Sequence, residues 1–144
     1  MKNIILTTID AMGKWASKKS MWPLSCGLSC CAIEMMHAAA SRVDLDQFGC
    51  LFRASPKHAD LMIIAGTVTK KMLPQLITLY EQMLDLKFVI AMGSCAISGG
   101  LYAESNTVIS DIGEFIPIDK KVPGCPPSPE ALAKAILEIQ NSSL

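Results

Sequence analysis

The sequence predicts a single α/β domain built on a parallel β-sheet that is flanked by helices. Short, almost wholly apolar segments at residues 60–66 and 87–93 have the length and composition of buried parallel strands. Helices are expected at residues 70–84, where apolar residues recur at helical spacing, and at residues 128–139. Strands that alternate with helices favour a parallel sheet. With 144 residues, 51% of them apolar, the chain can bury one hydrophobic core.

The first 20 residues are weakly patterned and end in a basic, polar stretch. We expect residues 1–20 to form an N-terminal arm or short helix that lies on a partner, and residues 21–144 to form the domain. Asp10 interrupts the early apolar stretch and no convincing cleavage site follows, so no secretory signal is expected. In a reducing compartment, six cysteines are better explained as metal ligands or buried thiols than as disulfides.

A helix start is predicted next to a pair of adjacent cysteines. Pro23 and Gly27 punctuate a loop, and residues 32–40 are rich in good helix formers. Cys30 and Cys31 should therefore lie at or just before the N-terminus of this helix.

Two further strands are predicted at residues 48–54 and 115–118. Pro74 falls near the first turn of the helix at residues 70–84, where proline is tolerated. The last helix should begin after Ser128, which can cap it, with Pro129 at the first helical position.

Charge and hydropathy narrow the possible partners. The chain has 13 basic and 13 acidic residues and therefore a net charge of zero. Without a net positive charge it does not attract nucleic acid at long range, so no nucleic acid partner is expected. Its mean hydropathy of +0.36 is high. No apolar block reaches the roughly 18–20 residues that span a bilayer. The high hydropathy is typical of a subunit whose surface other subunits cover, or of a protein with a tightly packed, methionine-rich core.

Two other cysteines follow predicted strands. Cys95 comes after the strand at residues 87–93, and Cys125 comes after the strand at residues 115–118, each in a loop containing glycine. Ligand sites in doubly wound sheets form just beyond the carboxyl ends of the strands, and glycine lets backbone approach a bulky group closely. A metal site on Cys30, Cys31, Cys95 and Cys125 is the resulting hypothesis.

The spacing alone leaves the metal open. An iron-sulfur cubane needs four thiolates, which three loops can supply. Structural zinc also accepts four thiolates, although its sites usually use CxxC knuckles, which are missing here. Cys26 and Cys50 are expected to be buried small apolar residues, with Cys26 as a rival ligand.

Five motifs together resemble one known family. CCAIEMMHAA, FRASP, AGTVT, MGSCA and VPGCPP, spread over residues 20–139, are similar to the cluster-bearing small subunit of proton-pumping NADH:quinone oxidoreductase, respiratory complex I. This subunit is called B in bacteria and PSST in mitochondria. The resemblance implies a flavodoxin-like sheet, similar to the small subunit of nickel-iron hydrogenases.

By this resemblance, Cys30, Cys31, Cys95 and Cys125 match the ligands of the family's terminal 4Fe-4S cluster, the last cofactor before quinone. The chain alone is expected to have no turnover, because it lacks a nucleotide-binding loop for NADH oxidation.

The resemblance also implies a quinone site and partner subunits. One wall of the headgroup pocket would come from this chain, and the other from the large subunit of the complex. A two-cluster ferredoxin-like subunit would supply electrons, and a membrane-arm subunit would lie at the quinone entry. Methionine suits such a wall because its thioether is flexible. The candidate lining residues are Trp22, Met35, Met36, Phe52 and Arg53.

The main alternative is the small subunit of a complex I-related membrane-bound nickel-iron hydrogenase. Those subunits usually carry their first two ligands in a CxxC pattern, whereas this chain has adjacent cysteines, which favours the quinone-reducing branch. The resemblance implies peripheral association with a membrane through the complex, on the cytoplasmic face of a bacterial inner membrane or the matrix face of the mitochondrial inner membrane.

Overall fold

Four parallel strands form the centre of the fold. The structure, a computed structural model, describes the backbone of residues 2–142 and the side chains of residues 6–142. The strands pair in the order β1-β2-β3-β4, with Leu61 opposite Pro23 on one side and Phe88 on the other. The strands are β1 Pro23–Gly27, β2 Leu61–Ala65, β3 Phe88–Met92 and β4 Lys120–Val122.

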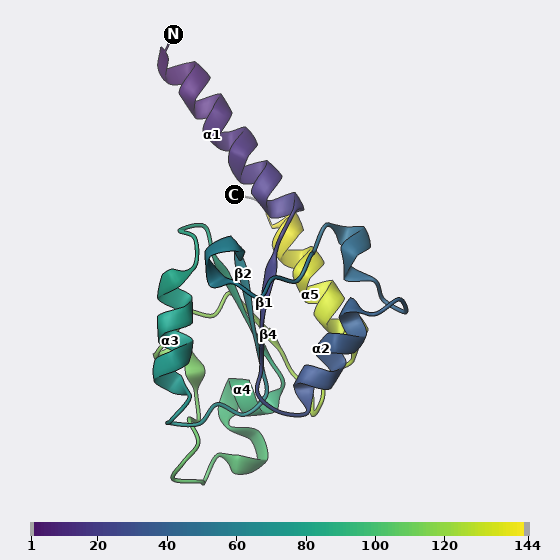
Figure 1. The fold of residues 1–144 in the computed structure, drawn as a ribbon, viewed down its shortest axis with the longest axis vertical. Coiled ribbons are helices and arrows are strands. Elements are labelled where there is room, and N and C mark those ends of the chain that lie inside the picture. The colour runs from purple at the N-terminus through teal and green to yellow at the C-terminus, as the bar shows by residue number, and fades with distance from the viewer. Residues whose placement is uncertain (1, 143–144) are drawn as a thin grey trace.

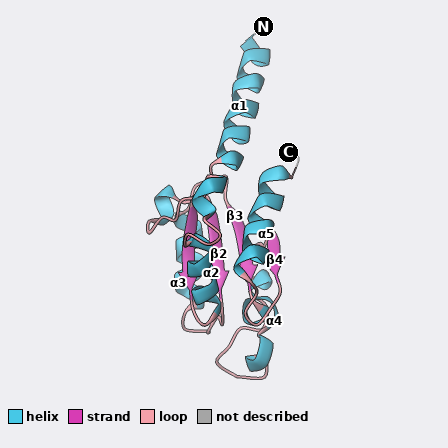
Figure 2. Ribbon diagram, turned by 90° about the vertical axis from the view of Figure 1, so that its right-hand side faces the viewer, coloured by secondary structure: helices cyan, strands magenta, loops and turns pink. Residues whose placement is uncertain are grey.

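Helices cover both faces of the sheet, giving three layers (Figure 1 and Figure 2). Alternate strand residues divide the core: Ile63 and Ile90 pack with α2 and α5, whereas Met62 and Val89 pack with α3. Because both faces are covered, β2 is buried along its whole length. The helices on the first face are α2 Cys31–Ala39 and α5 Pro129–Asn141, and those on the second are α3 Leu73–Gln82 and α4 Ser94–Ser98.

The strand predicted at residues 48–54 is reduced to a single bridge. Leu45–Phe48 forms a 3-10 turn instead. Arg53 then pairs in parallel with Leu24, and its N–H donates to the Pro23 carbonyl on the edge of β1 away from β2. The chain thus leaves β1, visits this outer edge and returns to the other side as β2. If this bridge is counted as a strand, the strand order is the flavodoxin-like one, in which the order of strands reverses at the first strand.

The strand predicted at residues 115–118 is wrong. That segment follows the 3-10 turn Ile112–Glu114, and the fourth strand is Lys120–Val122. Pro117 has no N–H to donate to a sheet, and Ile116 is buried in the core on the α3 face. The apolar run therefore reflects packing beneath the sheet.

Two elements were missed. The segment Pro23–Gly27, expected to be a loop, is strand β1, because its proline, serine and glycine leave no apolar run to mark it, and Ser94–Ser98 forms the short helix α4. The starts of the other predicted helices agree with the structure to within three residues. Cys30 is the N-cap residue of α2. Pro74 lies in the first turn of α3. The Ser128 hydroxyl caps α5 by accepting from the Ala131 N–H at 3.3 Å, and Pro129 is the first helical residue.

Helix α1, Lys2–Lys19, extends away from the amino ends of the strands (Figure 1). Its last turn is tied to the C-terminal end of α5. Lys18 Nζ donates to the Ser142 carbonyl at 2.9 Å, and Lys19 Nζ donates to Asn141 Oδ1 at 3.0 Å. In the described part of the chain, no helix is both long and apolar enough to cross a membrane.

Candidate metal centre

Three loops carry the four candidate cysteines to one end of the sheet. Cys30, Cys95 and Cys125 each lie three residues beyond the end of a strand, namely β1, β3 and β4. Because the strands are parallel, their carboxyl ends lie at the same end of the sheet, and all three loops leave the sheet there. This is the end next to α4 in Figure 1. Cys31 follows directly as the first residue of α2.

The loop after β2 contributes no cysteine, but it supports the loop of Cys30. The Thr67 N–H donates to Ser29 Oγ at 3.0 Å. Gly66 adopts a φ of +112°, and a Cβ there would come 2.0 Å from the same Ser29 oxygen. The tight contact of Ser29 with the end of β2 therefore requires glycine.

The other three candidate cysteines lie close enough to Cys31 to affect its thiol. Burial and three neighbouring cysteines raise the pKa of the Cys31 thiol to about 11. After burial, the strongest influence is Cys30, which acts through its charge and a side-chain hydrogen bond, and the charges of Cys95 and Cys125 act in the same direction. Cys31 and Cys95 are buried, whereas Cys30 and Cys125 are exposed.

Glycines clear the space around the two buried thiols. A Cβ on Gly93 would lie 2.4 Å from Cys31 Sγ, and a Cβ on Gly100 would lie 3.0 Å from Cys95 Sγ. Both glycines have positive φ, +93° and +53°. A side chain at either position would crowd the buried sulfur atom next to it.

Hydrogen bonds join the loop that carries Cys95 to the loop that carries Cys125. The Ser94 N–H and hydroxyl both donate to the Gly124 carbonyl, at 2.9 Å and 3.1 Å. The Gly93 N–H donates to the Val122 carbonyl at 2.8 Å. The loops of Cys95 and Cys125 are therefore fixed relative to each other by backbone as well as by the sheet.

This donor set fits an iron-sulfur cluster. Four cysteine thiols are the usual ligands of a cubane, and the glycines leave room beside the two buried sulfurs. Among the side chains that the structure describes, no three His, Cys, Asp or Glu residues are gathered about a position for one metal ion.

The other two cysteines are buried away from this group. Cys26 faces the core on the α3 side, and Cys50 lies in the core beneath α2 and α5, where Gln140 Nε2 approaches its sulfur at 3.6 Å. Burial raises the pKa of each thiol to about 11. These positions agree with the expected role of both as buried thiols.

Comparison with known proteins identifies the family. A family model described as "NADH ubiquinone oxidoreductase, 20 Kd subunit" matches residues 29–139, which include all four candidate cysteines. The chain belongs to this family.

The curated relatives agree with the family assignment. The chain is 54% identical over 140 residues to the B subunit of the NADH-quinone oxidoreductase of Citrifermentans bemidjiense, covering 97% of this chain and 82% of the relative. It is 55% identical over 139 residues to the protein of the same name from Geotalea daltonii, covering 96% and 81%. As a member of this oxidoreductase family, the chain is a subunit of an oxidoreductase complex.

A solved structure has the same fold. A chain of the membrane-bound sulfane sulfur reductase, an archaeal respiratory membrane complex, superposes with a TM-score of 0.85 at 38% identity. The match covers 92% of this chain and 77% of that one. The predicted fold class of this NADH-quinone oxidoreductase family member, a parallel sheet flanked by helices, is confirmed.

The five residues predicted to line a quinone pocket lie in three different environments. Trp22 and Arg53 stack on each other at the amino end of β1, with 4.2 Å from the guanidinium carbon to the ring centroid. Met35 and Phe52 pack in or against the core beneath α2 and α5, and Met36 is exposed on α2. The quinone pocket of this oxidoreductase subunit stays a prediction.

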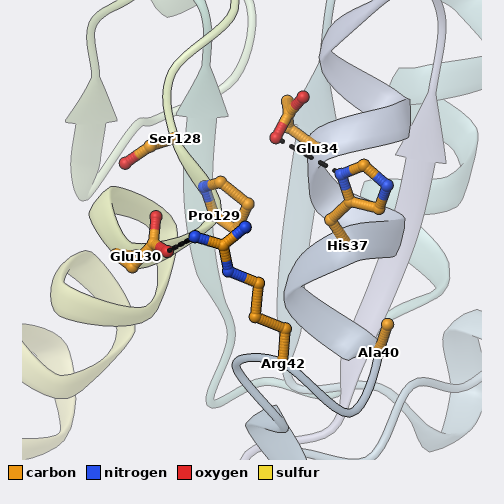
Figure 3. A pocket seen from close by; sticks show the side chains of 7 residues that line it. All are labelled: Glu34, His37, Ala40, Arg42, Ser128, Pro129 and Glu130. Carbon is orange, nitrogen blue, oxygen red and sulfur yellow. Dashed lines mark ion pairs between the residues drawn. The ribbon is translucent and has the colours of Figure 1, made fainter.

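One feature near the cysteines was not predicted. A cavity of about 480 Å³ lies between α2 and the start of α5 (Figure 3). Two side-chain pairs line it: Glu34 Oε2 is 3.6 Å from His37 Nδ1, and Glu130 Oε1 forms an ion pair with Arg42 Nη2 at 3.9 Å. Glu34 and His37 are three residues apart on a helix, a spacing that could have indicated the first pair. The pairing of α2 with α5 is a tertiary contact that no local pattern encodes. The cavity is lined by Glu34, His37, Ala40, Arg42, Ser128, Pro129 and Glu130.

Proposed function

We propose that Cys30, Cys31, Cys95 and Cys125 hold one 4Fe-4S cluster, and that the chain passes electrons through it from an upstream iron-sulfur subunit to quinone. The convergence of four thiols from three loops, with glycine beside each buried sulfur, is the observation that carries this proposal. The names of the curated relatives support the quinone reaction.

The local electrostatics favour thiolate ligands at this position. Cys31 opens α2, so the positive end of the helix dipole lies beside the adjacent cysteines and stabilises negative charge there. The raised pKa of Cys31 belongs to the metal-free thiol. Ligation by iron replaces the thiol proton, so assembly of the cluster is expected to release protons.

A bound cluster would supply one-electron redox chemistry, and the chain would control access to it. Cys31 and Cys95 stand on the buried side, where the sheet and α2 exclude water. Cys30 and Cys125 stand on the exposed side, where a partner can approach. Exposed apolar residues also surround this end, at Ile33, Met36, Leu101 and Tyr102.

We assign this exposed end to partner subunits. These exposed apolar side chains belong to α2 and to the turn that follows α4, the elements next to the cysteines. We propose that the large subunit of the complex and the two-cluster ferredoxin-like subunit cover them. Met36 is 66% exposed and is the best placed candidate in this chain for the quinone wall. Membrane association would be peripheral and would come through the complex, including its membrane-arm subunit.

A subunit of a membrane-bound hydrogenase is the second candidate function. The observation that favours it is the structural match to another respiratory membrane complex. Identities of 54–55% to NADH-quinone oxidoreductase subunits exceed the 38% identity to that chain. The quinone-reducing branch is therefore favoured.

EPR spectroscopy of the dithionite-reduced, anaerobically purified chain tests the cluster. We expect a signal from a reduced 4Fe-4S cluster and about four iron atoms per chain. Cys31→Ser should abolish both, whereas Cys26→Ala should keep both, because Cys26 lies on the other face of the sheet. A colourless, EPR-silent protein that contains one zinc ion would overturn the proposal.

A further inference from the structure

A second cavity opens at the opposite end of the sheet from the cysteines. Its volume is about 370 Å³, and it lies where β1 begins, at the base of α1. The backbone of Gly49 passes so close to the last turn of α1 that a Cβ there would be 2.6 Å from the Lys19 carbonyl oxygen. The segment that leads into the cavity is therefore packed against α1. The lining residues are Trp22, Arg53, Ala54, Ser55 and His58.

Arg53 stands in this cavity without a polar partner for its side chain. Its guanidinium stacks on the Trp22 ring at 4.2 Å, and its Nε atom is buried with no hydrogen bond. None of the ion pairs among the described residues involves Arg53. A buried N–H without an acceptor is costly, and a charged group costs more, so such an atom indicates a missing partner.

The polar groups next to Arg53 do not bind its guanidinium. Ser55 precedes the 3-10 turn Pro56–His58, but its hydroxyl makes no capping hydrogen bond. The carboxylate of Asp60 accepts from the Trp22 N–H at 2.5 Å and forms no ion pair with Arg53. The cavity therefore presents a guanidinium, an imidazole and a hydroxyl, with no carboxylate bound to the guanidinium.

We infer that this cavity binds a phosphate group. A guanidinium offers several N–H donors in a planar fork that matches phosphate oxygens, and charge-assisted hydrogen bonds of this kind are strong. Stacking on Trp22 holds the fork in one plane. An anion also neutralises the partly buried charge, which a neutral ligand does not. The inference does not rest on the cluster. Because Trp22 and Arg53 are also two of the residues predicted to line the quinone pocket, the test includes a quinone as a competing ligand.

Phosphate can come from two sources, free phosphate or a phospholipid headgroup. Helix α1 rises from the cavity and exposes Leu6, Ile9, Met12 and Trp15. An exposed helix with apolar residues and lysines at one end is suited to a membrane surface. The experiment therefore has an arm for each source.

Fluorescence of Trp22 in the full chain measures binding directly. The chain has two tryptophans, so Trp15→Phe leaves Trp22 as the only indole. Titration with inorganic phosphate should change its emission saturably. Flotation with phosphatidylcholine vesicles, with and without phosphatidic acid, forms the second arm. Either source binding supports the site, and the arm that responds identifies the source.

Variants at the two arginines separate this site from general charge effects. Arg53→Gln should weaken phosphate affinity roughly ten- to hundredfold, and Arg53→Lys should weaken it less, because the charge remains but the fork is lost. Arg42→Gln, on the far side near α5, should bind as the parent does. Circular dichroism checks that each variant folds.

Two results would overturn the inference. One is binding by Arg53→Gln or Arg53→Lys that equals binding by the parent. The other is a Trp22 response to a neutral, water-soluble quinone with none to phosphate or to phosphatidic acid.

Discussion

Gly93 faces the thiol of Cys31 across the end of the sheet, and a Cβ atom on Gly93 would stand 2.4 Å from Cys31 Sγ. That separation is far below van der Waals contact. The φ of +93° at Gly93 is also a conformation that side-chain-bearing residues rarely adopt. The buried thiol and the loop that carries Cys95 can therefore lie together only because residue 93 has no side chain.

Gly93→Ala is expected to remove most of the bound iron and to cost about 1–3 kcal/mol of unfolding free energy, because both the Cys31 thiol and the loop must shift. Iron content per chain and urea unfolding measure the two effects. Gly13→Ala is the matched control, since a Cβ there meets nothing within 4 Å. This variant should keep its iron, and its free energy of unfolding should rise by about 0.5–1 kcal/mol. Full iron content in Gly93→Ala would show that the clearance is not needed.

Ser128→Ala should lower the free energy of unfolding by about 1 kcal/mol, because the hydroxyl that accepts from the Ala131 N–H is lost. Ser128 lies three residues after Cys125, so the start of α5 also sets the direction of that loop. Urea denaturation of the cluster-free chain gives the value. Ser41→Ala, at an exposed turn, provides the comparison, and an equal loss in both variants would argue against the cap.

Asp60 should make the protein less stable as the pH rises. Burial raises the pKa of this carboxyl above its ordinary 3.8. The folded state therefore holds its proton to higher pH than the unfolded state does. The protonated carboxyl contributes to the free energy of unfolding. This contribution is fully present below pH 3.8 and is lost as the pH rises through the pKa of the folded state.

Asp60→Asn should therefore stabilise the chain at pH 7 and flatten this part of the pH profile, because an amide oxygen can still accept from the Trp22 N–H. Asp60→Ala removes that acceptor and should be less stable than Asp60→Asn at every pH. Thermal unfolding between pH 4 and pH 8, in roughly half-unit steps, compares the three proteins. A steeper profile for Asp60→Asn than for the parent would contradict the assignment.

Leu101→Ala tests the exposed end beside the cysteines. Leu101 is 84% exposed in the 3-10 turn Gly100–Tyr102, so its removal should change the unfolding free energy by less than about 0.5 kcal/mol. If partner subunits cover this end, the variant should be recovered in the assembled complex at reduced yield. Leu84→Ala, at an exposed position two residues beyond α3, should assemble normally. Equal yields for both variants would place the partners elsewhere.

Local patterns predicted most elements because those elements depend on neighbours in the chain. The buried strands β2 and β3 appear in the sequence as apolar runs, since both of their faces are covered. The start of α5 was predictable from Ser128 and Pro129 for the same reason, because a cap bonds within its own first turn.

The edges of the sheet were harder to predict. Only Val122 is buried in β4, so that strand has no apolar run, and the nearby apolar segment with Pro117 was taken for it. At the other edge, the predicted strand pairs only through Arg53. An edge strand is defined by its hydrogen bonds to a neighbour, and those bonds leave little trace in hydropathy.

The sequence by itself determined that Cys95 follows a strand end, because the apolar run of β3 ends three residues before it. It did not reveal β1 before Cys30, and it placed the strand before Cys125 at the wrong segment. Only the tertiary structure decided which side chains meet. Parallel pairing over some 60 residues of intervening chain brings Cys31 to Cys95, and the same pairing carries Trp22 and Arg53 to the opposite end of the sheet. The physical reason is that strand order and direction arise from long-range hydrogen bonding and burial, which place residues by register and not by their distance along the chain.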